Sequence, residues 1–172
     1  LTYTGEPHFS IARFPDMKER TIVVNGFSKA YAMTGWRLGY LAAPLDVIPA
    51  MDKVMQHSVG CVNTFAMWGG VAALTGDQTC VEEMRKQFEQ RRSFVIGRLA
   101  GMGLSTAPAE GAFYAFINVG GDDVATANKW LDKAHVAATP GTAFGAPGWI
   151  RISYAASMER LAEALDRIEA VQ

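Results

Sequence analysis

The chain has 172 residues, of which 49% are hydrophobic and 19% are charged, as in an ordinary globular protein. Its formal net charge is −1 with both signs interspersed, which argues against the basic surface that a nucleic acid partner requires. No apolar run reaches the roughly 18 residues of a membrane span. The N-terminal LTYTGEPHF also lacks the pattern of a secretory signal. We therefore expect a cytoplasmic protein that binds neither nucleic acid nor membrane.

The first half of the chain is expected to hold strands and helices in alternation. β-branched residues predict a strand at residues 21–25, and an apolar run closed by Pro44 predicts another at residues 38–42. Apolar residues at helical spacing predict a helix over residues 45–58. An Asn-Thr cap predicts a further helix over residues 63–74.

The two strands of this half are too few to form a stable sheet. An isolated strand pair is marginal in water and leaves apolar edges open. The chain also begins with Leu1 rather than methionine. We therefore expect it to be a fragment of a longer protein, with further strands upstream of Leu1.

The second half is expected to form a small α/β domain in which helices cover strands. Asp77 predicts the N-cap of a long helix that ends near residue 100, at a glycine-rich break. A Ser157 cap begins the last helix. Its inward residues are expected to be Leu161, Leu165, Ile168 and Val171. Between these helices the pattern predicts a strand at 112–118, a helix at 124–134, and strands at 136–139 and 149–154.

Cys61 and Cys80 have neither CxxC nor Cys/His ligand spacing. Such cysteines are typical of buried thiols in a reducing compartment rather than of a disulfide framework or metal site. We expect no bound metal.

The segment NGFSKAYAMTGWRLGY, residues 25–40, holds the cations Lys29 and Arg37. A lysine that forms an imine with a carbonyl must lose its proton, and burial among apolar groups lowers the pKa of a lysine. Such surroundings are expected from Phe27, Tyr31, Met33 and Trp36. By itself, however, Lys29 is better interpreted as a solvent-exposed loop lysine.

Arg37 strengthens the interpretation of this segment as a binding site. It lies eight residues after Lys29, a span of about 26 Å when extended, so a turn at Thr34-Gly35 must fold the loop back for both cations to reach one ligand. An arginine fork suits a phosphate, and Ser28 offers a hydroxyl. The implied ligand has a carbonyl at one end and a phosphate at the other. Taken alone, Arg37 would be read as a surface salt bridge.

The segment SKAYAMTGWRLGY closely resembles the lysine motif of class I/II aminotransferases, which are pyridoxal-phosphate enzymes of fold type I. Further segments match in order and spacing, namely ERTIVVNGFSK, EGAFYAFINV, PGTAFG and WIRISYAAS. The resemblance implies the type I PLP-transferase fold. Residues 1–60 would end the large α/β cofactor domain, 61–76 would connect, and 77–172 would form the small C-terminal α/β domain.

The resemblance also assigns roles to individual residues. Lys29 would hold pyridoxal 5'-phosphate as a Schiff base and move the proton at the substrate Cα. Arg37 would bind the cofactor phosphate, with Ser28 as a second contact. Arg151 would grip the α-carboxylate of the substrate. Read without the family, Arg151 is an exposed charge at a strand end, although its flanks Ile150 and Ile152 are apolar.

The implied activity is transamination between an amino acid and a 2-oxo acid, by a protein that is a homodimer at full length. The family's aspartate at the ring nitrogen, its tyrosine at the ring hydroxyl and its glycine-containing phosphate loop all fall before the region matching Leu1. Gly26 stands where many members have a serine to the phosphate. We therefore expect this chain alone to be inactive.

Alternative functions remain open at this point. A lyase, decarboxylase or synthase of the same fold would share the lysine and the arginines. A pyridoxal-phosphate-binding effector domain of a transcription regulator is a non-enzymatic alternative, which would require a DNA-binding segment upstream that this chain does not contain. The amino donor is not indicated by any motif.

Overall fold

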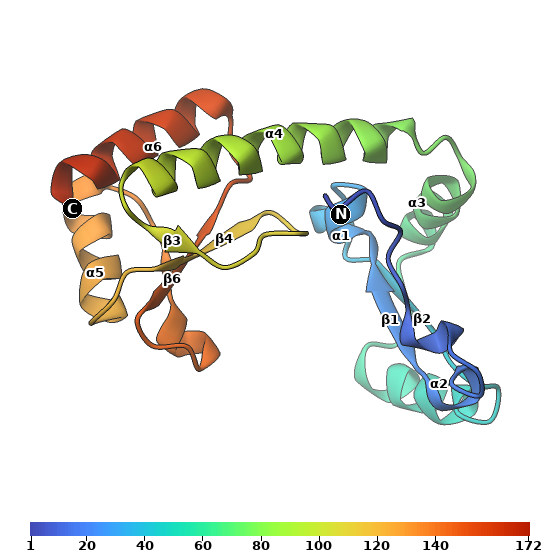
Figure 1. The fold of residues 1–172 in the computed structure, drawn as a ribbon. Coiled ribbons are helices and arrows are strands. Elements are labelled where there is room, and N and C mark those ends of the chain that lie inside the picture. Colours follow the sequence, from blue (N-terminus) through green and yellow to red (C-terminus); the bar gives the residue numbers. More distant parts are fainter. The chain divides into compact units, whose positions relative to one another are not determined.

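The computed structural model describes residues 1–172, which divide into two compact units. We call residues 7–83 the lysine unit, and residues 1–6 together with 84–172 the arginine unit. The helix α4 (Thr79–Gly101) runs from one unit into the other (Figure 1). The division falls after Glu83, and the first six residues join the later unit, while the domain boundaries at residues 60 and 76 stay a prediction.

The lysine unit consists of short elements around one strand pair. In chain order they are η1 (Ile11–Arg13), η2 (Lys18–Arg20), β1 (Val23–Gly26), α1 (Phe27–Ala30), η3 (Thr34–Trp36), β2 (Gly39–Ala42), α2 (Ile48–Ser58) and α3 (Thr64–Thr75).

Strands β1 and β2 form an antiparallel two-stranded sheet, with Val23 opposite Ala42 and Gly26 opposite Gly39. Both faces of the pair are open: 76% of Val24 is exposed on one face, and 42% of Tyr40 on the other. Within this chain β1 and β2 pair only with each other.

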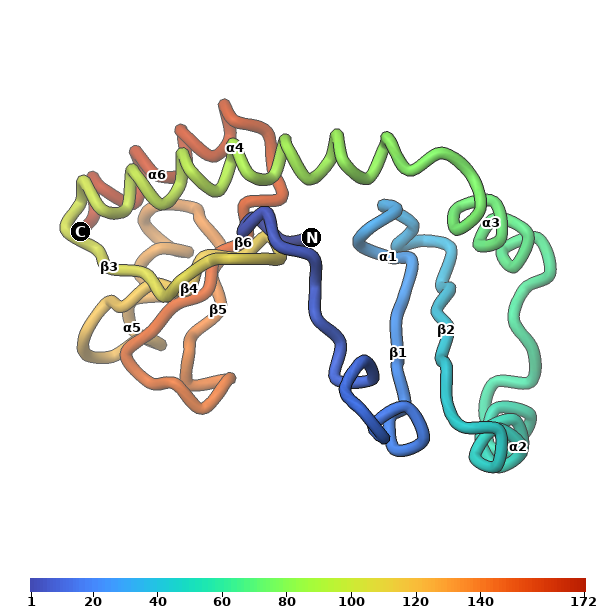
Figure 2. The backbone as a smooth tube through the Cα atoms, turned by 45° about the vertical axis from the view of Figure 1, so that its right-hand side comes forward, coloured from blue at the N-terminus to red at the C-terminus, as the bar shows by residue number.

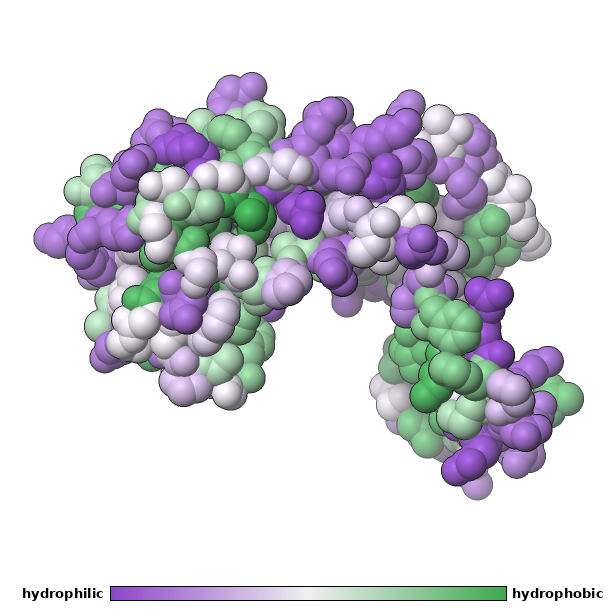
Figure 3. All heavy atoms as spheres, in the orientation of Figure 1, coloured by the Kyte–Doolittle hydropathy of each residue, from purple (hydrophilic) through white to green (hydrophobic).

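The helices α2 and α3 form where their apolar spacing predicted. The Asn63 side chain caps α3 by accepting a hydrogen bond from the N–H of Phe65 at 3.2 Å. Their apolar faces are nevertheless exposed: α2 has no buried residue, and 70% of Trp68 is exposed. Figure 3 shows apolar side chains at the surface of this part of the chain.

The arginine unit is built on an antiparallel four-stranded sheet of order β3-β4-β6-β5. Figure 2 shows β4 and β6 running side by side at its centre. The strands are β3 (Ser105–Thr106), β4 (Tyr114–Asn118), β5 (Thr139–Pro140) and β6 (Trp149–Ser153).

Strand β5 is shorter and later than the strand predicted at 136–139. The preceding helix α5 (Asp123–Lys129) continues into the wide π turn η4 (Trp130–Ala134) and ends at His135, which has a left-handed φ of 55°. Pro140 then ends the strand because proline has no N–H to donate to the sheet.

Helices α4, η4 and α6 (Met158–Val171) pack on one face of this sheet. Alternation along β4 and β6 turns Ala115, Ile117, Ile150 and Ile152 toward them, all of which are buried. Burying an Ile or Leu side chain contributes about 1.5–3 kcal/mol. Of the predicted inward residues of α6, Leu161, Leu165 and Ile168 are at most 6% exposed, and Val171 is partly buried against the same core.

The caps of the long helices follow the sequence closely. Ser157 caps α6 by accepting from the N–H of Arg160 at 3.4 Å. Asp77 lies just before α4 and accepts from the N–H of Thr79 at 3.0 Å and from its hydroxyl at 2.7 Å. These hydrogen bonds, the hydroxyl first, lower the pKa of Asp77 because they favour its carboxylate.

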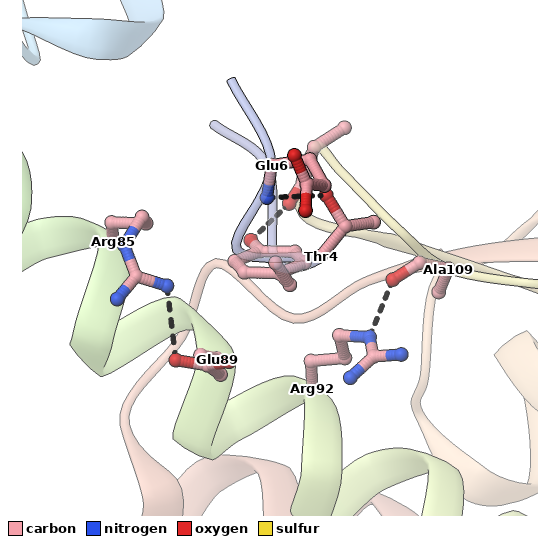
Figure 4. A network of polar contacts seen from close by, with 8 residues as sticks. Thr4, Glu6, Arg85, Glu89, Arg92 and Ala109 are labelled. Atoms are coloured by element: carbon pink, nitrogen blue, oxygen red, sulfur yellow. Dashed lines mark hydrogen bonds and ion pairs between the residues drawn. The ribbon is translucent and has the colours of Figure 1, made fainter. Parts of the chain in front are cut away.

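The first residues of the chain dock onto the arginine unit. The N–H of Tyr3 donates to the carbonyl of Glu110 at 2.9 Å, and its hydroxyl donates to the carbonyl of Ala112. Nearby, Arg92 donates through Nε to the carbonyl of Ala109, and Arg85 pairs with Glu89 at 3.0 Å (Figure 4). None of the helices of the chain is both long and apolar enough to cross a membrane.

Candidate active site

The lysine loop connects β1 to β2 and folds back on itself. At its base Gly26 lies opposite Gly39, and the N–H of Phe27 donates to the carbonyl of Leu38 at 3.2 Å. Ser28 and Arg37 each lie one residue beyond this hydrogen-bonded pair. The return that the sequence required for both cations to serve one ligand is therefore present in the backbone.

Buried side chains hold the loop in this shape. Phe27, Met33 and Leu38 are 3%, 8% and 9% exposed and form a small core. The ring of Phe27 lies 5.7 Å from that of Tyr31 and 5.5 Å from that of Tyr40.

Two consecutive glycines let α3 approach the loop closely. A Cβ on Gly69 would lie 2.6 Å from the ring of Trp36, and a Cβ on Gly70 would lie 2.6 Å from Leu38 Cδ2. No side chain fits at such distances without a shift of its neighbours. The loop therefore packs against the backbone of α3.

Lys29 is exposed, so the expectation that aromatic residues would bury it is wrong for this chain. Phe27 and Met33 do turn inward. In the helical turn α1, however, Lys29 follows Phe27 by two residues, which places it about 200° around the helix axis. Burial of Phe27 thus directs Lys29 away from the core.

Arg37 has a left-handed backbone, with φ 52° and ψ 49°. Its guanidinium donates to the carbonyl of Thr34 at 2.9 Å. A non-glycine residue in this conformation costs about 1 kcal/mol or more and often marks a functional site. The conformation belongs to the tight return from η3 into β2.

A concave region of about 570 Å³ opens beside Arg37, a size suited to a small cofactor. It is lined by Gly35, Trp36, Arg37, Val59, Cys61, Val62, Asn63 and Phe65. Ser28 and Lys29 are not among these lining residues. The loop therefore offers a hydroxyl, a primary amine and a guanidinium, and of the residues that bear them Arg37 lines this hollow.

Arg151 lies on the central strand β6, opposite Phe116 of β4 and Thr139 of β5. It is half-buried, and its guanidinium carbon lies 4.4 Å from the ring centre of Tyr114 and 4.5 Å from that of Phe144. Ring faces attract a cation without neutralising it. The charge therefore remains available to a carboxylate.

A small cavity of about 150 Å³ lies beside Arg151. Its walls come from Tyr114, Ala137, Ala138, Thr139, Arg151 and Ser153. Its size suits a carboxylate better than a whole cofactor.

The two aromatic partners of Arg151 were not predicted from the sequence. Alternation along β4 could have revealed Tyr114, because it shares a face with Phe116, which lies opposite Arg151. Phe144 lies within the recognised segment PGTAFG, but nothing in the sequence indicates which way its ring turns.

Asp123 was also missed, and it is the buried charged residue of the core. Its carboxylate accepts from the N–H of Thr142 at 2.7 Å, from the Thr142 hydroxyl at 2.9 Å and from the N–H of Gly148 at 3.3 Å. The hydrogen bonds, led by that from the N–H of Thr142, lower its pKa. The segment GGDDVA could have indicated it. Two successive aspartates begin the helix, and only one of them is needed as its N-cap.

The two cysteines are both exposed, which corrects the expectation that they are buried. Cys61 lies in the connection between α2 and α3, and Cys80 lies in the first turn of α4. Neither segment is covered within the lysine unit.

The predicted site residues fall in different units. Ser28, Lys29 and Arg37 share one loop of the lysine unit, whereas Arg151 belongs to the arginine unit. No group of three or more His, Cys, Asp or Glu side chains is placed to hold a metal ion.

Comparison with known proteins decides the family. The family model "Aminotransferase class I and II" matches residues 2–168. The chain belongs to this family. The resemblance found in the sequence is thereby confirmed, together with the type I PLP-transferase fold.

Several aminotransferases are similar to this chain. The aspartate aminotransferase of Musicola paradisiaca is 47% identical over 175 residues, which cover 98% of this chain and 44% of the relative. The aspartate aminotransferase of Thermotoga maritima is 44% identical, with the same coverage of 98% and 44%. The chain thus spans less than half the length of these relatives.

Solved aminotransferase structures share the fold. The aromatic aminotransferase from Pyrococcus horikoshii OT3 matches with a TM-score of 0.95 and 44% identity, covering 99% of this chain and 47% of that one. The aspartate aminotransferase of Thermotoga maritima matches with a TM-score of 0.91 and 44% identity, covering 99% and 44%.

Proposed function

We propose that the whole protein is a pyridoxal-phosphate-dependent aminotransferase that moves an amino group between an amino acid and a 2-oxo acid. The observation that carries this proposal is the folded-back loop of Ser28, Lys29 and Arg37, in a chain 47% identical to an aspartate aminotransferase. Relatives named as aminotransferases favour transamination over lyase, decarboxylase or synthase chemistry.

The donor set of the loop fits pyridoxal phosphate. Arg37 would bind the phosphate through its planar fork, and Ser28 would add a hydroxyl donor. Lys29 would bond to the carbonyl carbon through its amine. Of these three residues Arg37 alone lines the hollow of about 570 Å³, so this hollow would receive the phosphate end of the compound. When bound, the cofactor supplies the electron sink for the chemistry at the substrate Cα.

Lys29 would act as general base and acid. After the substrate amine has replaced the lysine on the cofactor carbon, the released Lys29 amine would take the proton from the substrate Cα and deliver it to that cofactor carbon. A base of this kind must reach the reacting atom at hydrogen-bond distance, and Lys29 is exposed on the short helix α1.

Arg151 would orient the substrate. Its guanidinium would bind the α-carboxylate with two parallel hydrogen bonds, which fixes the direction of the Cα–H bond. The small cavity that it lines with Thr139 and Ser153 is the place for that carboxylate.

L-Aspartate is the first amino donor to test, because the aspartate aminotransferases of several organisms resemble this chain. An aromatic amino acid is the second, because an aromatic-amino-acid aminotransferase is 43% identical. We further propose that the protein works as a homodimer in the cytoplasm.

Replacing Lys29 tests the proposal. In the whole protein, Lys29→Ala should lose the visible absorbance of the bound cofactor and lower the transamination rate by about 100-fold or more. The rate is measured with L-aspartate and 2-oxoglutarate. Lys53→Ala, at an exposed lysine of α2, is the matched control and should behave as wild type. A Lys29→Ala protein that transaminates at the wild-type rate would refute the mechanism.

A further inference from the structure

The buried carboxylate of Asp123 does not cap a helix. Its neighbour Asp122 is the N-cap of α5 and accepts from the N–H of Ala125 at 2.9 Å. Asp123 is 3% exposed and turns to the loop of residues 141–148, which connects β5 to β6. A buried charge is costly unless donors satisfy it, so these contacts need a reason.

The donors that satisfy Asp123 come from both ends of this loop. Thr142, near its start, gives an N–H at 2.7 Å and a hydroxyl at 2.9 Å. Gly148, at its end, gives an N–H at 3.3 Å. The Asp123 carboxylate therefore links the two ends of the loop by hydrogen bonds.

The loop is also tight at its base. The N–H of Ala146 donates to the carbonyl of Gly141 at 3.0 Å. A Cβ on Gly141 would lie 2.2 Å from the Ala146 carbonyl oxygen and 2.8 Å from Trp149 Cβ. The backbone between these points has little freedom to move.

Phe144 is the side chain that this loop presents to Arg151. Its ring centre lies 4.5 Å from the guanidinium carbon, and 51% of the residue is exposed. Tyr114, on the other side, is set by the register of the sheet. The ring of Phe144 also meets Phe116 of β4 edge-on, with 6.4 Å between the ring centres, and its backbone is held by the loop that bears it.

We propose that Asp123 is a positioning residue for Arg151: through the loop of residues 141–148 it keeps Phe144 against the guanidinium. This contact restricts the long arginine side chain to one direction from β6. The N–H donors of Arg151 are then already oriented when a carboxylate arrives, so the arginine side chain loses less conformational freedom on binding. The inference rests on the proposed role of Arg151 in binding the substrate α-carboxylate.

Asp123→Asn tests the inference in the whole protein with its cofactor bound. The amide nitrogen of Asn is a donor and cannot accept from Thr142, so the loop should loosen. The KM for the amino acid should rise about 10-fold, while kcat and the cofactor absorbance stay near wild type. Asp122→Asn is the matched control, because Asn caps a helix as well as Asp does. Its KM should not change.

A double variant separates positioning from a general loss of structure. Phe144→Ala should raise the KM to a similar extent, and Asp123→Asn combined with Phe144→Ala should be no worse than Phe144→Ala alone, because both act through one contact. Effects that multiply, or an equal fall in kcat and cofactor binding, would overturn the inference. If Asp123→Asn does not fold, Thr142→Val removes only the hydroxyl donor and should raise the KM by a smaller factor. An unchanged KM in that variant would count against the inference.

Failure of this inference can be told from failure of the proposed function. An active wild type with a raised KM in Arg151→Ala, but a normal KM in Asp123→Asn, refutes the inference and leaves the function standing. A wild type that neither binds pyridoxal phosphate nor transaminates refutes the function, and the inference falls with it.

Discussion

Arg151 is half-buried, yet the side chains that flank it are rings rather than carboxylates. A paired carboxylate would compete with the substrate, whereas the faces of Tyr114 and Phe144 do not. This arrangement suits a cation whose role is to bind an anion that comes and goes. The apolar flanks Ile150 and Ile152 have a different cause, because alternation along β6 turns them to the opposite face of the sheet and into the core.

Replacing Arg151 should separate substrate binding from cofactor binding. Arg151→Ala removes a charge-assisted pair worth about 1.5–3 kcal/mol, so the KM for the amino acid should rise by about 10- to 100-fold. The absorbance of the bound cofactor, measured in parallel, should stay at the wild-type level. An equal loss of both would show that the role of Arg151 has been misassigned.

Asp123 predicts a pH dependence of stability. Its pKa is lowered in the folded state, chiefly by the N–H of Thr142, from an ordinary value of about 3.9. Its contribution is therefore fully present above about pH 4 and is lost as the pH falls through the lowered pKa. Urea midpoints of wild type and Asp123→Asn should differ most near neutral pH and converge in acid. A difference that does not change with pH would contradict this account.

At the scale of elements, α3 and the lysine loop are one packing unit. The loop is buried only through Phe27, Met33 and Leu38, and Gly70 lies directly against two of these side chains. The shape of the loop therefore depends on an element more than thirty residues later in the chain.

A pair of glycine substitutions tests this dependence. Gly70→Ala places a methyl group 2.6 Å from Leu38 Cδ2 and should destabilise the protein by about 1–3 kcal/mol. Gly97→Ala is the matched control, because its Cβ meets nothing within 4 Å and it lies within α4. That substitution should stabilise by about 0.5–1 kcal/mol through helix propensity. Thermal unfolding measures both, and the prediction fails if the two substitutions shift the midpoint in the same direction.

At the scale of the whole molecule, the two units differ in how completely they are packed. The arginine unit has a core of fully buried residues that includes Val95, Leu99 and Ile117. The lysine unit buries few apolar side chains, and its strand pair is open on both faces. Large apolar side chains of this unit are exposed, among them Leu45, Val54 and Trp68.

We expect the 172 residues alone not to transaminate. Lys29 is exposed, and the chain spans 44% of the relatives whose activity is named. Mixing this chain with pyridoxal phosphate, L-aspartate and 2-oxoglutarate should give a rate no higher than that of free pyridoxal phosphate. Robust activity under these conditions would contradict the expectation.

Much of the fold was predictable because its signals are local. The Asn63 and Ser157 caps, the course of α4 and the inward residues of α6 follow from hydrogen bonds and spacing within a few residues. The short length of β5 was harder to predict, because the π turn η4 and Pro140 together decide where its pairing with β6 begins and ends.

The sequence by itself determined the family, the elements and the cations of the loop, since motif spacing and helix caps are properties of neighbouring residues. Only the tertiary structure decided that Lys29 is exposed, that Arg151 lies between two rings and that Asp123 closes the loop bearing one of them. The physical reason is that burial and ring contacts depend on residues distant in sequence. The role of a buried carboxylate can be inferred only when its hydrogen-bond donors are known.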